Sequence, residues 1–163
     1  MEIPKQIIHF LNRQGFVLVA TIDANDRIHG SAKGVVALAA ESRILIIDLY
    51  LRGTYRNLQR DPRMSITAVD EKCFKGYTLQ GRGVIVPRQE ISSAILAQWE
   101  QRMTERISRR VVRGVQSASK STTHFEAHLP PKPQYIIEFE LEHIIDLSPP
   151  SLNQSKPKEE KSE

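Results

Sequence analysis

The sequence predicts a mainly β protein in which six antiparallel strands form a barrel with flanking helices. Short runs rich in β-branched residues follow one another up to residue 86, with only turns and one short helix between them. A last run follows a late helical stretch. Because a parallel sheet would need a helix between each pair of strands, this order favours an antiparallel barrel.

Length and composition fit one domain with a tail. The chain has 163 residues, 40% of them hydrophobic, which is enough to bury a core. We expect the domain to span residues 1–150, with a helical insertion over 88–120. After Pro149 and Pro150 the sequence is polar and of balanced charge, so residues 151–163 are expected to form a disordered tail.

The N-terminal part is predicted to form a helix followed by three strands. Pro4 suits the first turn of a helix in which Ile7, Ile8 and Leu11 recur at helical spacing. Turn-forming residues at 23–26 then separate two β-branched runs. The expected strands span residues 16–22, 28–38 and 43–50.

A short helix is predicted over residues 54–60, followed by two strands. Thr54 is suited to cap this helix, and Pro62 blocks its continuation. Gly81 and Gly83 indicate a bulge or a sharp corner in the second of the strands. The expected strands span residues 64–69 and 76–86.

A longer helical region with a basic face comes next, before a last strand over 135–147. Apolar side chains recur every four residues from Trp99 to Val115. The basic face can be solvated, with nearby glutamates as partners, or can receive an anionic substrate or cofactor phosphate. The scarcity of aromatic side chains argues against nucleic acid. The face consists of Arg102, Arg106, Arg109 and Arg113.

Composition also favours a cytoplasmic protein. The single cysteine, Cys73, cannot form an internal disulfide, and residues 1–5 show no basic segment followed by an apolar one. No window approaches the roughly 18 consecutive apolar residues of a membrane helix, so no membrane partner is expected. The net charge of +4 suits an anionic ligand and is too small to demand nucleic acid.

Five segments form a recognisable series: Ala20-Thr21-Ile22, Gly30-Ser31-Ala32-Lys33-Gly34, Ile44-Leu45-Ile46-Ile47, the stretch from Thr54 to Ile66, and Leu79-Gln80-Gly81-Arg82-Gly83. Together they resemble the flavin-binding split barrel, the family of the pyridoxamine 5'-phosphate oxidases and the small FMN-binding proteins. The short helix followed by Asp61-Pro62-Arg63 is the most specific piece. The resemblance implies a six-stranded antiparallel split β-barrel of Greek-key topology.

In that family FMN lies at a dimer interface, so the resemblance implies a homodimer with noncovalent FMN. A phosphate dianion needs cationic side chains and free backbone N–H groups, which a helix N-terminus offers. The implied cofactor-binding residues are Ser31, Ala32, Lys33 and Gly34 along the ribityl and phosphate chain, Ile47 and Asp48 near the ring, Arg52, Gly53 and Thr54 at the phosphate, and Asn57, which fixes the loop.

Two positions leave the identity of the cofactor and its contacts undecided. Gly53 or Thr54 stands where many members of the family have a lysine in the phosphate loop, which leaves room for deazaflavin F420, haem or no cofactor. Asp48 is a carboxylate within an apolar run, and it needs a donor or an opening onto a cleft. That donor can be a flavin N–H or a backbone N–H.

The expected function is that of an FMN-dependent oxidoreductase that passes hydride or electrons to or from a small-molecule redox partner. No catalytic side chain is assigned, since the cofactor carries the chemistry. The alternatives are a noncatalytic flavin carrier or sensor and a haem-binding or haem-degrading split barrel. His124 and His128 have the i, i+4 spacing of metal ligands, but without a third ligand we interpret them as part of a polar loop.

Overall fold

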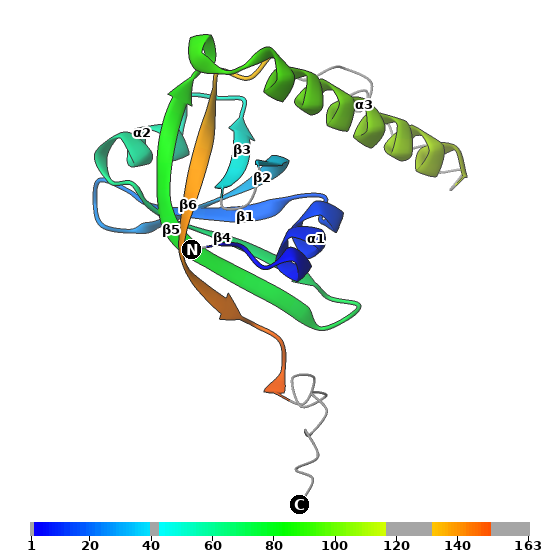
Figure 1. Ribbon diagram of the computed structural model, residues 1–163, viewed down its shortest axis with the longest axis horizontal. Coiled ribbons are helices and arrows are strands. Elements are labelled where there is room, and N and C mark those ends of the chain that lie inside the picture. The colour runs from blue at the N-terminus through cyan, green and yellow to red at the C-terminus, as the bar shows by residue number, and fades with distance from the viewer. Residues whose placement is uncertain (1, 40–42, 117–131, 151–163) are drawn as a thin grey trace, which may run out of the picture.

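A computed structural model describes residues 2–39, 43–116 and 132–150 (Figure 1). Within these ranges the chain forms strands, helices and one 3₁₀ turn at Arg88–Glu90. In chain order they are α1 (Lys5–Arg13), β1 (Val17–Ile22), β2 (Ile28–Ala39), β3 (Arg43–Asp48), α2 (Gly53–Arg60), β4 (Arg63–Asp70), β5 (Lys75–Pro87), α3 (Ser93–Gln116) and β6 (Tyr135–Asp146).

The strands close into an antiparallel barrel in the order β1-β2-β3-β6-β5-β4, and β4 pairs with β1 to complete it. β1, β2 and β3 follow one another as neighbours, after which the chain crosses through α2 to reach β4. β6 then fits between β3 and β5. The predicted fold class is confirmed, and so is the short helix in the middle of the chain.

Two glycines of β5 allow the close approach of neighbouring strands. The register between β5 and β6 shifts at Gln80/Gly81, as the predicted bulge requires. A Cβ on Gly81 would lie 2.0 Å from the carbonyl oxygen of Glu140, and one on Gly83 would lie 2.3 Å from the sulfur of Met64. A side chain at either position would therefore displace the barrel wall.

The core of the barrel is apolar, and α1 extends it. Ile7 and Leu11 point from α1 onto the strands, and Leu11 is fully buried. The helical spacing of these two residues is what lets one face of α1 seal the barrel. The strand residues at the centre of the core include Val17, Val19, Ile44, Ile46, Ile66, Leu79, Ile137 and Phe139.

β3 is buried on both faces, which explains its continuous apolar sequence. Ile44 and Ile46 face the barrel core, whereas Leu45 and Ile47 face a second cluster on the outside. The first turns of α3 cover that cluster through Trp99. The late helical stretch thus serves first as a lid on the outer surface of the sheet.

The outer part of α3 extends away from the barrel (Figure 1). Arg102 donates a hydrogen bond to the side-chain oxygen of Asn12, near the end of α1, at 3.1 Å. The side chains of Arg106, Arg109 and Arg113 lie outside the described part of the structure, as do residues 124–128 and 151–163. The basic face, the histidine pair and the tail therefore stay predictions.

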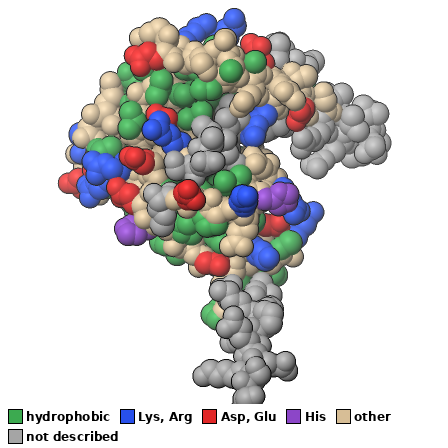
Figure 2. Space-filling view, viewed as in Figure 1, with side chains coloured by type: hydrophobic (Ala, Val, Ile, Leu, Met, Phe, Trp, Pro, Cys, Tyr) green, Lys and Arg blue, Asp and Glu red, His purple; other side chains and the backbone are tan. Residues whose placement is uncertain are grey.

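The surface of the described residues shows mixed charge. On the face shown in Figure 2, basic and acidic side chains are interspersed rather than gathered into an extended patch of one sign. This agrees with the small net charge of +4. None of the helices in the described ranges has the length and apolar character to cross a membrane.

Candidate functional site

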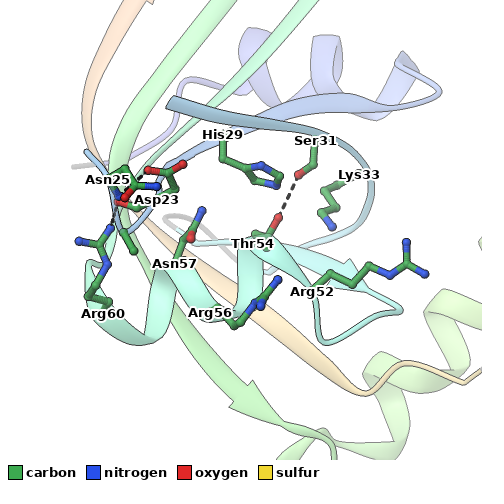
Figure 3. A pocket seen from close by; sticks show the side chains of 12 residues that line it. Asp23, Asn25, His29, Ser31, Lys33, Arg52, Thr54, Arg56, Asn57 and Arg60 are labelled. Carbon is green, nitrogen blue, oxygen red and sulfur yellow. Dashed lines mark hydrogen bonds between the residues drawn. The ribbon is translucent and has the colours of Figure 1, made fainter. Parts of the chain in front are cut away.

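An open cavity of about 890 Å³ lies between β2 and α2 (Figure 3). β2 lines one side, α2 lines the other, and the turn between β1 and β2 contributes one end. Polar and charged side chains dominate the lining, so the cavity suits a ligand rich in oxygen and negative charge. The lining residues are Asp23, Ala24, Asn25, His29, Ser31, Lys33, Arg52, Gly53, Thr54, Arg56, Asn57 and Arg60.

Alternation along β2 sends every second side chain into the cavity. His29, Ser31 and Lys33 line it, and Ser31 pairs in register with Val19 of β1. Ala32 lies between two of them, is exposed and does not line the cavity. Because side chains of a strand alternate between faces, only part of the predicted run 31–34 offers side chains to a ligand here.

The amino end of α2 opens onto the same cavity. The helix begins at Gly53, with Arg52 at the N-cap position and no side-chain cap. The prediction that Thr54 caps the helix is therefore wrong: its hydroxyl instead lies 3.0 Å from that of Ser31. The first N–H groups of a helix have no intrahelical acceptor, so α2 brings backbone donors and the positive end of its dipole to the cavity.

Gly53 is the point of closest approach between α2 and β2. A Cβ at this position would lie 2.8 Å from Nε2 of His29. Glycine thus lets the imidazole lie directly against the first turn of the helix, as Figure 3 shows for the side chain of His29 above α2. This contact gives a physical reason for glycine at position 53.

Two arginines one helical turn apart supply positive charge. Arg52 stacks over the ring of Tyr50, with 5.2 Å between its guanidinium carbon and the ring centroid. Arg56 lies on the next turn, exposed and lining the cavity. Neither guanidinium has a carboxylate partner among the described residues. Both are therefore available to an anionic ligand.

Arg60, a third arginine on α2, is held in place by the barrel. It donates to the carbonyl oxygen of Ile22 at 2.9 Å and also to that of Asp23. The carboxylate of Asp23 accepts backbone N–H bonds from Arg27 and Asn25, and these bonds lower its pKa. At this end of the cavity, Arg60 is thus tied to the turn between β1 and β2.

A partly buried ion pair lies at the opposite end of the cavity wall. Lys33 donates to Oδ2 of Asp48, and the hydroxyl of Tyr135 donates to the same oxygen at 2.6 Å. The N–H of Tyr50 lies 3.3 Å from the other carboxylate oxygen. Burial raises the pKa of Tyr135, and its hydrogen bond to Asp48 adds to the shift. Asp48 thus finds its donors inside the protein, mainly from two side chains.

α2 is also fixed to the barrel by a buried polar contact. Nδ2 of Asn57 donates to the hydroxyl of Thr21 at 3.0 Å, and both residues are buried. Leu58 packs next to them in the barrel core. The predicted task of Asn57, which is to hold the local structure, agrees with this contact.

The whole site lies within a stretch of sequence that matches a known family. The family model described as pyridoxamine 5'-phosphate oxidase matches residues 3–143. The chain belongs to the pyridoxamine 5'-phosphate oxidase family. No sequence match is found among curated proteins.

Several solved structures share the fold. HupZ of Group A Streptococcus is 17% identical with a TM-score of 0.63, and the match covers 90% of this chain and 94% of HupZ. A pyridoxamine 5'-phosphate oxidase-related, FMN-binding protein of Nostoc punctiforme is 15% identical with a TM-score of 0.60, over 87% and 81% of the two chains. An F420 reductase is 13% identical with a TM-score of 0.57, over 88% and 98%.

The donors of the cavity fit a phosphate monoester, which is the anionic group of FMN. Two uncompensated guanidiniums, Arg52 and Arg56, stand beside the helix N-terminus. The hydroxyls of Ser31 and Thr54 add neutral donors on both walls. Charge-assisted hydrogen bonds and helix N–H groups of this kind are what bind phosphate in proteins.

The structure brings together most of the residues that the resemblance implied. Ser31, Lys33, Arg52, Gly53, Thr54 and Asn57 all line the cavity. Ala32, Gly34, Ile47 and Asp48 do not line it. Ile47 belongs to the outer cluster under α3, and Asp48 is sealed behind Lys33.

Some cavity residues were missed by the sequence reasoning. His29 could have been found from the period of two that it shares with Ser31 and Lys33. Arg56 was not included in the predicted site. No simple sequence signal marks the turn residues Asp23 and Asn25, since their place at the cavity follows from how β1 and β2 meet α2.

Outside this cavity, the reactive side chains of the described residues do not form a second cluster. Cys73 is free and exposed in the turn between β4 and β5. Across the described ranges, no group of three or more histidine, cysteine, aspartate and glutamate side chains is placed to hold a metal ion. Among the described residues, the cavity between β2 and α2 is therefore the candidate functional site.

Proposed function

We propose that this protein binds FMN noncovalently in the cavity between β2 and α2 and acts as an oxidoreductase. One observation carries the proposal: the amino end of α2, Arg52 and Arg56, and the paired hydroxyls of Ser31 and Thr54 all line one open cavity. A phosphate dianion needs this combination of cations and preoriented donors. The family and the FMN-binding protein of the same fold support FMN as the source of that phosphate.

The residues of this chain would anchor and orient the cofactor. When bound, the flavin supplies the hydride or electron transfer. Arg52 and the first N–H groups of α2 hold the phosphate, while Ser31 and Lys33 face the polyol chain from β2. No side chain is assigned to the chemical step, and the small-molecule partner is identified only as a donor or acceptor of reducing equivalents.

We also propose a homodimer, as the resemblance to the family implies. Leu18 of β1 is 48% exposed and Ile28 of β2 is 82% exposed, so the strands beside the cavity carry apolar area that a second copy can cover. Binding at a two-fold interface would link cofactor affinity to assembly. Sedimentation with and without FMN tests this: a monomer in both conditions contradicts it.

The proposal is tested by reconstitution with FMN. The purified protein is incubated with FMN, desalted and examined by absorption, and its affinity is measured by quenching of flavin fluorescence. Loss of a charge-assisted phosphate contact is expected to weaken FMN binding about tenfold or more in Arg52→Ala. Arg82→Ala, an exposed arginine on β5 outside the cavity, removes the same charge and should leave the affinity unchanged.

The same experiment separates the alternatives. A protein that stays colourless and shows no thermal shift with FMN contradicts the proposal. A structure named as an F420 reductase shares the fold, so deazaflavin F420 is tested in parallel. Haem would give a Soret band. A flavin that binds but does not turn over with reduced nicotinamide and an acceptor would indicate a carrier or sensor.

A further inference from the structure

A charge-compensated lysine stands in the wall of the cavity. The side chain of Lys33 is 14% exposed and lines the cavity, whereas that of Asp48, with which it forms an ion pair, is 4% exposed. Tyr135 lies behind them and is 1% exposed. The lysine therefore faces a ligand with its positive charge already balanced from inside the protein.

The carboxylate does not depend on the lysine alone. Oδ2 of Asp48 accepts from both Lys33 and Tyr135, and Oδ1 accepts from the N–H of Tyr50. An ammonium has three N–H donors, and Asp48 is the only acceptor recorded for Lys33 among the described residues. Lys33 can thus donate toward the cavity while Asp48 stays in place.

The two walls of the cavity consequently differ in charge. Arg52 and Arg56 on α2 have no carboxylate partner in the described part of the chain. On β2, the positive charge of Lys33 is cancelled over a short distance in a poorly solvated place, where opposite charges interact strongly. An anion entering the cavity is drawn to α2, and a neutral oxygen-rich group is matched to β2.

We propose that Asp48, held by Tyr135, is a positioning residue that balances the charge of Lys33. The anionic group of the ligand is thereby directed to α2. Lys33 is left to donate hydrogen bonds to a neutral polyol part of the same ligand. This inference rests on the proposed function, because it assigns the phosphate of FMN to one wall and its ribityl chain to the other. It makes Asp48 a determinant of binding orientation although it does not line the cavity.

The test compares FMN with riboflavin, which lacks the phosphate. The dissociation constant of riboflavin divided by that of FMN isolates what the phosphate contributes to binding. Both constants are measured by flavin fluorescence. Arg52→Ala is expected to lower this ratio about tenfold. Lys33→Gln is expected to weaken the binding of both ligands about fivefold, because a donor to the polyol is lost. It also leaves the carboxylate of Asp48 without its cation, so the ratio is expected to fall about threefold, less than in Arg52→Ala.

Asp48→Asn is expected to change the ratio of dissociation constants in the opposite direction. Without the carboxylate the charge of Lys33 is uncompensated, so the ratio is expected to rise about threefold or more. The double variant Lys33→Gln, Asp48→Asn leaves no unpaired buried charge and should return the ratio to within about twofold of the wild type. If Asp48 had a purely structural role, its substitution would weaken the binding of FMN and riboflavin together and would not raise the ratio.

Two results would overturn the inference. Lys33→Gln lowering the ratio as far as Arg52→Ala would show that the lysine holds the phosphate. An unchanged or lowered ratio in Asp48→Asn would show that its carboxylate does not set the charge of this wall. If Asp48→Asn does not fold, the double variant Lys33→Gln, Asp48→Asn is used instead. A ratio in the double variant as low as that of Arg52→Ala would also contradict the inference.

A ligand-free measurement separates this inference from the proposed function. The inference predicts a protected ammonium signal of Lys33 in ¹H–¹⁵N spectra of the wild type, weaker in Tyr135→Phe. Inorganic phosphate should shift the amide signals of Gly53 and Thr54 and leave the Lys33 signal in place. If neither flavin binds but these signals behave so, the proposed function fails and the charge arrangement stands; a Lys33 ammonium that is unprotected or that moves with phosphate overturns the inference.

Discussion

Two short helices cover the barrel on different sides, and they do so with different chemistry (Figure 1). α1 buries Ile7 and Leu11 against the apolar core. α2 also buries a leucine, Leu58, but it buries Thr54 and Asn57 beside it. One helix therefore stabilises the barrel through apolar area, whereas the other combines packing with polar contacts that build a site.

The largest loss of stability is expected when the packing of α1 is disrupted. Leu11→Ala removes a fully buried side chain and should lower the free energy of unfolding by about 3 kcal/mol. The FMN affinity of the folded protein should not change, since α1 contributes nothing to the cavity lining. Urea denaturation and flavin quenching measure the two quantities. A loss below about 1 kcal/mol would show that α1 is not part of the core.

A smaller effect is expected at the polar contact of α2. Asn57→Ala removes the hydrogen bond to Thr21 and leaves a buried hydroxyl without that donor, which should cost about 2 kcal/mol of stability. FMN affinity should fall as well, because α2 carries the phosphate donors. Gln59→Ala, an exposed position on the same helix, should stay within about 0.5 kcal/mol. Equal losses in the two variants would contradict the role of Asn57.

The contact between α2 and β2 can be tested at Gly53. Gly53→Ala places a Cβ against the imidazole of His29 and should cost about 1 kcal/mol, with a weaker affinity for FMN. Shortening the neighbour in Gly53→Ala, His29→Ala should recover the stability. Thermal melts of the single and double variants measure this. A single variant as stable as the wild type would show that His29 moves aside freely.

The smallest effect concerns the residue that ends α2. Hydrogen bonds from Arg63 lower the pKa of Asp61 from 3.8 to about 2. Because the folded pKa lies below the unfolded one, the interaction stabilises the protein above about pH 4 and is lost as the pH falls toward 2. Asp61→Asn should therefore lower Tm slightly at pH 7 and not at pH 2, as followed by circular dichroism. The same difference at both pH values would contradict the assignment.

Much of the fold could be predicted because its signals are local. Alternating β-branched runs, turn residues and one proline after a short helix were enough to place the strands and α2. Gly81 indicated a bulge, and the structure has one there. Helix starts are less well marked: Thr54 has the chemistry of a cap, but its hydroxyl meets Ser31, a contact 23 residues away in sequence.

The site was predicted less completely because it depends on contacts between distant elements. The resemblance named a continuous run from Ser31 to Gly34, whereas the pleat of β2 turns alternate side chains to the cavity. Asp48 was expected to need a flavin or backbone N–H, and it takes its shortest bonds from the side chains of Lys33 and Tyr135. Tyr135 lies 87 residues further along the chain, so local sequence could not pair them.

A crystal structure of the protein grown with FMN would show directly whether α2 holds the phosphate of FMN. We expect electron density for the phosphate within hydrogen-bonding distance of the backbone N–H groups of Gly53 and Thr54, with Arg52 turned toward it. Lys33 should keep its ion pair with Asp48. Density for the phosphate at Lys33, or anywhere away from the first turn of α2, would contradict the proposed binding mode.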